Sequence, residues 1–270
     1  AAKKLLPFQR GLHASSHVSW TLGLDGTPIL GGPKDRGAPF SPRDLLARVH
    51  DWYRENYGDG MNMDMSPGSI VLVVNDNIWK LKLPKVWGTV TVFADRDLSN
   101  VGVPIGVREA STHNCLRSVE GLTQAFANKL TDQEVLFIHQ AFQHGFQAMS
   151  GLESLSGHSL FEEARADYRH SVDAVFSGVE FGKARWEAAQ CAEKVLKGLL
   201  AKFGHKFPTN AGKGHDHVHL GEIVRVKLGV DFDNAALATL KTSPAVRYGE
   251  APSSLDEAMD SHAALLYLLT

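Results

Sequence analysis

The sequence predicts an α+β protein, in which a small antiparallel β-meander with helices is followed by an up-and-down helical bundle. Three short strand-like runs follow one another between residues 69 and 93, and from about residue 112 onward apolar residues recur at helical spacing. The chain of 270 residues is long enough for two domains. We expect the boundary in the Ser- and Gly-rich stretch 150–158, with an α+β domain over 1–150 and a helical bundle over 151–270.

The N-terminal stretch 1–39 is punctuated by glycine and proline and predicts irregular structure, with one short strand where apolar residues alternate over 20–24. The first helix is expected to begin at Ser41. Its hydroxyl can cap free backbone amides, a proline follows at the first helical position, and Asp44 favours the positive end of the helix dipole. Gly58 is expected to end this helix.

The strand-like runs are 69–75 (SIVLVVN), 78–83 (IWKLKL) and 87–93 (WGTVTVF). The second alternates apolar with basic residues, which is typical of a half-exposed strand. Only a few residues separate each run from the next, and connections of this length favour antiparallel neighbours. The sequence therefore predicts a three-stranded antiparallel meander.

Helical patterns occupy the rest of the chain. One apolar face runs through 112–130, and Thr131 with the glutamate three residues on forms a capping box that opens a helix ending at Gly151. Ser159 repeats the same pattern with a glutamate at the same spacing. Further helices are expected over 159–175, 182–202, 217–228, 233–241 and 254–269.

The composition is ordinary, with 43% hydrophobic and 21% charged residues and a net charge of −2. This balance disfavours a strongly basic nucleic-acid-binding protein, although it allows a local basic face. Cys115 and Cys191 form no CxxC pair, so we expect two free thiols in a reducing cytosol. The apolar run after Lys4 is too short for a signal peptide, and no stretch is long enough to span a membrane. We expect a cytoplasmic protein.

Three segments of the C-terminal part resemble motifs of the HEPN domain family. Residues 182–200 (GKARWEAAQCAEKVLKGLL) are similar to the HEPN helix that reads A-x-x-x-A-Q-x-A-x-E-K-x-L-K-x-L. The triplet GHD at 214–216 resembles the one that opens the third helix of that family, and VRYG at 246–249 resembles its Arg-Tyr turn before the last helix. The resemblance covers about 155–270, and no family is apparent for 1–150.

The resemblance implies a bundle of four or five helices that commonly dimerises, in a family whose members bind nucleotides or cut RNA. The RNA-cutting members carry an arginine, a polar residue, three to five further residues and a histidine. This chain departs from that pattern, since the first histidine after Arg247 is His262, fifteen positions on. One literal match runs from Arg165 to His170, but alanine replaces the polar residue. A solvent-facing pair is the simpler interpretation.

The leading hypothesis is a non-catalytic binding module that recognises a nucleotide, an RNA phosphate or a protein partner and forms a homodimer. The expected ligand-binding residues are Arg247, Tyr248, Lys183, Arg185 and Lys197. The alternative is a HEPN ribonuclease that acts as a toxin or defence effector, with an arginine–histidine pair across a dimer. A structural or regulatory partner protein without a small ligand is the third possibility.

The same segment also supports a plainer interpretation. Basic residues gather over 183–213, but Glu187 and Glu193 are interleaved with them, so this face is interpreted as a solvated helix surface unless a ligand is found. The helical spacing places Trp186 on the apolar stripe inside the bundle and Lys197 on its wet face.

The densest group of titratable side chains contains His215, His217 and His219, with Glu222 one turn later. Two imidazoles and a carboxylate on one helix face can hold zinc. A solvated helix N-terminus, where Asp216 favours the dipole, is the simpler interpretation, and we expect no metal and no cofactor. The chain has no P-loop, no G-x-G-x-x-G and no G-x-S-x-G, so no catalytic residues are assigned.

A nucleotidyltransferase is a further possibility, because such domains often accompany HEPN domains. Gly68 and Ser69 are followed by Asp95 and Asp97, and such an enzyme needs two carboxylates that hold magnesium. The spacing between the two pairs is too long for that fold, so a polar turn after the third strand is the preferred interpretation.

Overall fold

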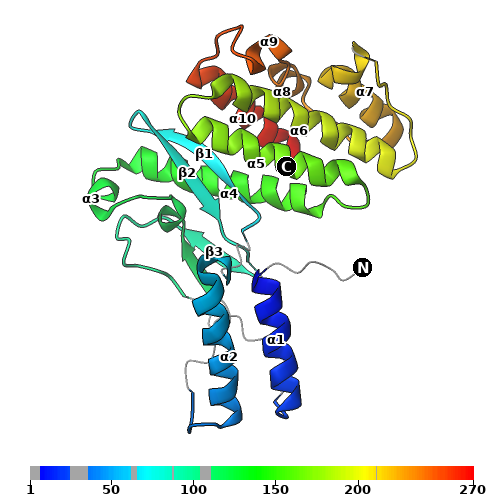
Figure 1. Ribbon diagram of the computed structural model, residues 1–270. Coiled ribbons are helices and arrows are strands. Elements are labelled where there is room, and N and C mark those ends of the chain that lie inside the picture. The colour runs from blue at the N-terminus through cyan, green and yellow to red at the C-terminus, as the bar shows by residue number, and fades with distance from the viewer. Residues whose placement is uncertain (1–6, 25–35, 62–65, 87, 104–110, 211) are drawn as a thin grey trace. The chain divides into compact units, whose positions relative to one another are not determined.

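The structure is a computed structural model that describes residues 7–24, 36–61, 66–86, 88–103, 111–210 and 212–270 (Figure 1). It confirms the α+β class, with a helical bundle and a small amount of sheet. The chain divides into two compact units, Ala1–Met65 and Ser66–Thr270. The stretch 150–158, where we expected the boundary, lies inside the second unit, in the end of its first long helix and the loop that follows.

The first unit is a pair of helices, α1 (Pro7–Thr21) and α2 (Pro42–Tyr57), followed by the short 3-10 helix η1 (Gly58–Met61). The start of α2 is confirmed, since the Ser41 hydroxyl accepts a hydrogen bond from the Asp44 amide at 3.2 Å. The predicted strand over 20–24 is wrong, because helix α1 extends to Thr21. Small residues at four-residue spacing, Gly11, Ser15 and Ser19, form the buried face of α1, which packs against α2, and apolar alternation is a poor guide to such a helix.

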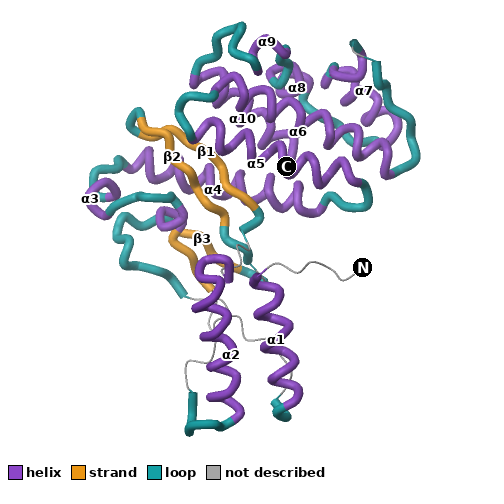
Figure 2. The backbone as a smooth tube through the Cα atoms, viewed as in Figure 1, coloured by secondary structure: helices purple, strands orange, loops and turns teal. Residues whose placement is uncertain are grey.

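Strands β1 (Gly68–Val74) and β2 (Asn77–Leu83) form the predicted antiparallel hairpin. Asn75 and Asp76 at its turn both have positive φ, at 52° and 57°, as a type I′ turn requires. The prediction that a third strand joins this hairpin is wrong. Strand β3 (Val90–Phe93) pairs in parallel with β4 (Ser111–Asn114). Figure 2 shows β3 apart from the hairpin of β1 and β2.

The physical reason lies at the free edge of β2. Leu81 forms a bridge with Val119, and the Glu120 amide donates a hydrogen bond to the Lys80 carbonyl at 2.8 Å. This later segment occupies the backbone groups that β3 would need. The helical pattern expected over 112–130 therefore forms only two short helical turns, η2 (Cys115–Ser118) and α3 (Gln124–Ala127).

Helix α4 (Asp132–Ser154) begins at the predicted capping box, in which the Glu134 carboxylate accepts from the Thr131 amide at 2.6 Å. It continues past Gly151, the predicted end. A Cβ atom on Gly151 would lie 2.0 Å from the Leu269 carbonyl oxygen, so this glycine allows a close helix–helix approach and does not terminate the helix.

The bundle continues from α4 with α5 (Ser159–Phe176), α6 (Phe181–Lys202), α7 (His217–Leu228), α8 (Asn234–Thr239), α9 (Pro244–Arg247) and α10 (Leu255–Leu269), and with the 3-10 turn η3 (Lys213–His215). The helices predicted in this region are confirmed. The cap of α5 is a correction, because His158, and not Ser159, caps the helix by accepting from the Leu160 amide at 3.2 Å. Among the described residues, no helix is long and apolar enough to cross a membrane.

Side chains of the bundle bind the outer edge of the hairpin. The Val71 amide donates to Nε2 of His262 at 3.1 Å, and the Tyr168 hydroxyl donates to the Ser69 carbonyl at 2.9 Å. Unpaired strand edges are a liability in sheets, and here α5 and α10 satisfy one. Sheet and bundle therefore share one core, which reaches from β1 to the end of α10.

Candidate functional site

Helix α6 carries three of the five predicted ligand-binding residues, and they lie toward its two ends. Lys183 and Arg185 lie in its first turns, beside α9 with Arg247 and Tyr248. Lys197 lies twelve residues after Arg185, about 18 Å along the helix axis. The five residues therefore do not form one site. The four near the N-terminal end of α6 can act together.

Helix α9 approaches α6 at Gly182. A Cβ atom on Gly182 would lie 2.2 Å from the Val246 carbonyl oxygen, so only a residue without a side chain allows this contact. The close approach places the Arg247 guanidinium over the ring of Trp186, 5.4 Å from its centroid. The same guanidinium lies 5.6 Å from the centroid of the Tyr248 ring. We call Trp186, Arg247 and Tyr248 the Arg247 stack.

The Arg247 stack corrects the expected position of Trp186, which is half-buried and does not belong to the apolar core. Its neighbours Ala184 and Ala188 are fully buried on the face that packs into the bundle. The indole lies about 160° around the helix from these two alanines, where Arg247 covers it. It is only about 60° from the buried Ala189, so the helical spacing alone did not exclude a buried position.

The charges near the Arg247 stack differ in how far they are neutralised. Arg185 pairs with Glu257 at 3.2 Å and donates to the Ser253 hydroxyl, and Lys183 pairs with Glu180 at 3.3 Å. The described residues place no carboxylate within ion-pair distance of Arg247, which is exposed. Arg247 is therefore the positive charge in this cluster that remains open to an anion.

The prediction that Lys197 lies on the solvent-facing side of α6 is wrong. It is only 9% exposed, and its ammonium pairs with the buried Glu193 carboxylate at 2.7 Å. Nδ1 of His215 lies 2.7 Å from the second oxygen of the same carboxylate, and the ring of Phe207 lies 5.7 Å from the ammonium. Lys197 is thus part of an internal charge network and does not face a ligand.

The histidines 215, 217 and 219 do not converge on one point. His215 contacts Glu193, whereas the buried His217 places Nε2 at 2.9 Å from the Ala189 carbonyl oxygen. Burial lowers the pKa of His217, and its contact with the Ala189 carbonyl opposes this shift. Asp216 caps α7 by accepting from the His219 amide, the arrangement expected of a helix N-terminus.

Arg165 and His170 are also separated. Five residues along a helix correspond to about 140° around its axis. Arg165 donates to the carbonyl of Leu155, at the end of α4, at 2.5 Å and pairs with Glu162 in the first turn of α5. His170 is exposed and lies close to Glu187 of α6. The two do not form an arginine–histidine site within one chain.

The carboxylates of the segment after β3 stabilise a turn. Asp95 accepts from the Asp97 amide and from the Asn100 side chain, both at 2.9 Å. These two hydrogen bonds lower the pKa of Asp95, the one from Asn100 most. Asp97 in turn accepts from the Ser99 amide and hydroxyl. This is the polar turn that we preferred over a magnesium site.

The Arg247 stack can bind an anion next to an aromatic group. An arginine held by aromatic rings keeps its donors in a fixed plane, and it suits the oxygens of a phosphate. Tyr248 is 70% exposed and offers a free ring face on which a base can stack. Comparisons of the chain with models of protein families, with curated proteins and with solved structures find no match.

Proposed function

We propose that this protein is a non-catalytic, HEPN-like binding module that recognises a nucleotide, free or within RNA, at the Arg247 stack. The observation that carries the proposal is the exposed Arg247 guanidinium, which lies over Trp186 with no carboxylate partner among the described residues. The resemblance of 155–270 to HEPN domains supports it, because many members of that family bind nucleotides.

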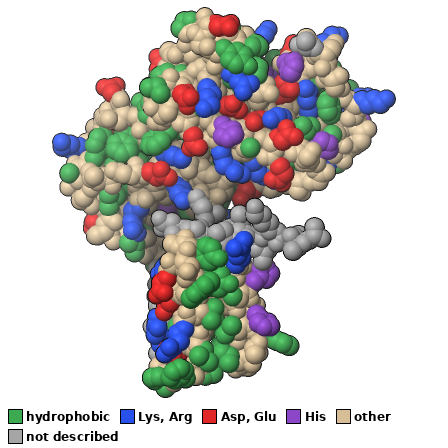
Figure 3. Space-filling view, viewed as in Figure 1, with side chains coloured by type: hydrophobic (Ala, Val, Ile, Leu, Met, Phe, Trp, Pro, Cys, Tyr) green, Lys and Arg blue, Asp and Glu red, His purple; other side chains and the backbone are tan. Residues whose placement is uncertain are grey.

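The chemistry of a nucleotide matches both parts of the stack. The phosphate would accept from Arg247, and the base would stack on the exposed face of Tyr248. Arg185 and Lys183 are paired with carboxylates, so they add a weaker positive field at the same end of α6. Over the rest of the bundle, charges of both signs are interspersed, as the face in Figure 3 shows, so no second broad basic surface competes on that face.

The test uses two probes, 5′-AMP in isothermal titration calorimetry and a short fluorescein-labelled single-stranded RNA in polarisation. Arg247→Ala and Tyr248→Ala should each weaken binding by about tenfold or more, since stacking of one base contributes about 1–3 kcal/mol. The matched control is Lys227→Ala, which removes an exposed positive charge on α7 and should leave binding unchanged.

Two results would contradict this proposal. If neither probe binds up to millimolar concentration, a nucleotide is excluded as the ligand. If Lys227→Ala and Arg247→Ala lose the same affinity, the binding is only a general attraction of charges. Light scattering in the same buffer tests the homodimer that the HEPN resemblance implies, and a mass of one 29.5 kDa chain at micromolar concentration would exclude it.

A further inference from the structure

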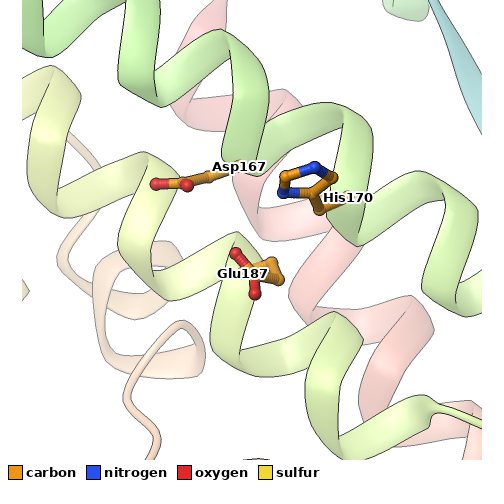
Figure 4. A group of neighbouring side chains, drawn as sticks. All are labelled: Asp167, His170 and Glu187. Atoms are coloured by element: carbon orange, nitrogen blue, oxygen red, sulfur yellow. The ribbon is translucent and has the colours of Figure 1, made fainter.

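The interface between α5 and α6 carries a polar cluster that the proposed binding site does not use. Helix α5 packs along α6: the Ser171 hydroxyl donates to the Ala184 carbonyl at 2.9 Å, and a Cβ atom on Gly198 would lie 2.6 Å from the ring of Phe161. Along one side of this interface lie Asp167 and His170 from α5 and Glu187 from α6 (Figure 4). Their imidazole nitrogen and carboxylate oxygens all lie within 4.8 Å of one another.

We propose that Asp167, His170 and Glu187 bind one divalent transition-metal ion, with Zn²⁺ as the best match. One imidazole and two carboxylates are ligands that zinc accepts, and three protein ligands leave a position for water or a bound molecule. Among the described residues, this is the group of potential ligands that the fold brings together. The cluster joins two helices, so a bound ion would also link them.

Only small side-chain movements would bring the three ligand atoms to the distances of a zinc site. Zinc lies about 2.0–2.2 Å from nitrogen and oxygen ligands, which places neighbouring ligands of a tetrahedral site about 3.4 Å apart. Asp167 is buried and fixed, whereas His170 is exposed and Glu187 is half-buried. Rotations of the two more exposed side chains can therefore bring their ligand atoms to Asp167 without a movement of the helices.

Asp167 provides an independent reason to expect a cation. Its side chain is buried in the bundle, and the Lys194 ammonium lies 2.7 Å from its Oδ2. Among the described residues no hydrogen bond or ion pair reaches its Oδ1, and burial raises the pKa of this carboxyl group. A buried carboxylate normally satisfies its oxygens with several donors or a metal, so Asp167 still has capacity for a ligand.

Lys194 does not block the site. Its ammonium also lies 3.4 Å from the carboxylate of Glu163, one turn before Asp167 on α5. When a metal ion binds the Asp167 carboxylate, Lys194 can remain paired with Glu163. The alternative to the proposal is that Lys194, Asp167 and Glu163 form a structural ion-pair network only, with no metal.

The experiment removes metals from the 270-residue chain with a chelator and then titrates it with Co²⁺, followed by displacement with Zn²⁺. We expect about one ion per chain, visible as Co²⁺ absorption that zinc abolishes. His170→Ala and Glu187→Gln should each lower the affinity at least tenfold. Both side chains are on the surface of the interface, so these variants should fold, which circular dichroism confirms.

The control is His219→Ala, which alters the histidine cluster of α7 and should leave the affinity unchanged. Metal should raise the melting temperature of the wild-type protein and not that of His170→Ala. The proposal is overturned if no ion binds at millimolar concentration, which leaves the structural ion-pair network only. It is equally overturned if binding survives His170→Ala or is lost in His219→Ala.

Discussion

At the scale of single residues, the buried pair of Glu193 and Lys197 shows how tertiary packing changes the role of a charged side chain. Lysines on a helix usually face solvent, and the spacing of the sequence agreed with that rule. The chain after α6 nevertheless returns over Lys197 with Phe207 and His215. The lysine that we expected to meet a ligand instead neutralises a carboxylate inside the bundle.

We expect Lys197→Ala to reduce the free energy of unfolding by about 3 kcal/mol, because it leaves the Glu193 carboxylate buried without its main partner. The contact with His215 keeps the loss at the low end of the range for broken buried pairs. Urea denaturation measures it. Lys227→Ala on the exposed face of α7 should change stability by less than about 0.5 kcal/mol.

The double variant Glu193→Gln with Lys197→Met separates charge from packing, and most of the lost stability should return in it. A loss below about 0.5 kcal/mol in Lys197→Ala would mean that the pair is not buried as described.

The buried His262 should make stability depend on pH. Burial, with a smaller effect of His144, lowers its pKa from 6.5 to about 4. The unfolded chain therefore takes up a proton first as the pH falls, and stability that is present above about pH 6.5 is lost between pH 6.5 and 4. Each unit of pKa difference corresponds to about 1.4 kcal/mol.

Urea denaturation at several pH values in this window, for the wild type and for His262→Gln, measures the contribution. Glutamine can still accept from the Val71 amide but does not titrate, so its stability should fall less steeply with decreasing pH. His113 and His217, whose pKa values burial also lowers, are common to both proteins and cancel in the comparison. Equal slopes would show that His262 is not protected from protonation.

At the scale of elements, the junction of α6 and α9 decides whether the Arg247 stack exists. Alanine normally stabilises a helix by about 1 kcal/mol relative to glycine. Gly182→Ala should do the opposite, because its methyl group would meet the Val246 carbonyl oxygen and push α9 away from α6. We expect lower stability, together with a loss of nucleotide affinity of about tenfold, measured by calorimetry on the same samples.

Gly212→Ala is the control for this change. Gly212 has a negative φ of −84° and nothing within 4 Å of the position of a Cβ atom. Its substitution should leave affinity and stability nearly unchanged. If Gly182→Ala instead stabilised the protein as a solvated helix position would, the close contact with α9 would be disproved.

At the scale of the whole molecule, the core belongs to the second unit. The connected apolar core runs from Ile70 to Leu269. In the described part of the first unit, the buried apolar side chains are Leu46 and Ala47, while Trp20 is 75% exposed. The second unit should therefore be the stable folding unit of the chain.

A fragment that begins at Ser66 should accordingly fold and retain the Arg247 stack, since all of its residues lie in this unit. Thermal melting by circular dichroism should be cooperative, and the affinity for 5′-AMP should equal that of the 270-residue chain. An insoluble fragment, or one without a cooperative transition, would show that residues 1–65 are needed for the core.

The fold also argues against RNA cleavage. Arg165 is tied to the start of α5, His170 points toward α6, and His262 is buried and bonded to a strand. We expect no cleavage of a labelled RNA in the presence of EDTA, measured by gel electrophoresis. The opposite outcome, with cleavage that disappears in both Arg165→Ala and His170→Ala, would establish the ribonuclease and an arginine–histidine pair from two chains.

The sequence by itself determined the elements whose signals are local. The caps at Ser41 and Thr131, the hairpin of β1 and β2 and the long helices of the bundle depend on residues within a few positions of one another. The assignment of Arg247 and Tyr248 to a ligand site rests on the HEPN resemblance and stays a prediction. These features needed no knowledge of distant contacts.

Only the tertiary structure decided which residues meet. Val119 takes the edge of β2 that the meander assigned to β3, Gly182 admits α9 beside Trp186, and the chain after α6 covers Lys197. Each outcome depends on a partner far away in the chain. Periodicity reports which face of an element is apolar, but it cannot report which other segment will cover that face or compete for its hydrogen bonds.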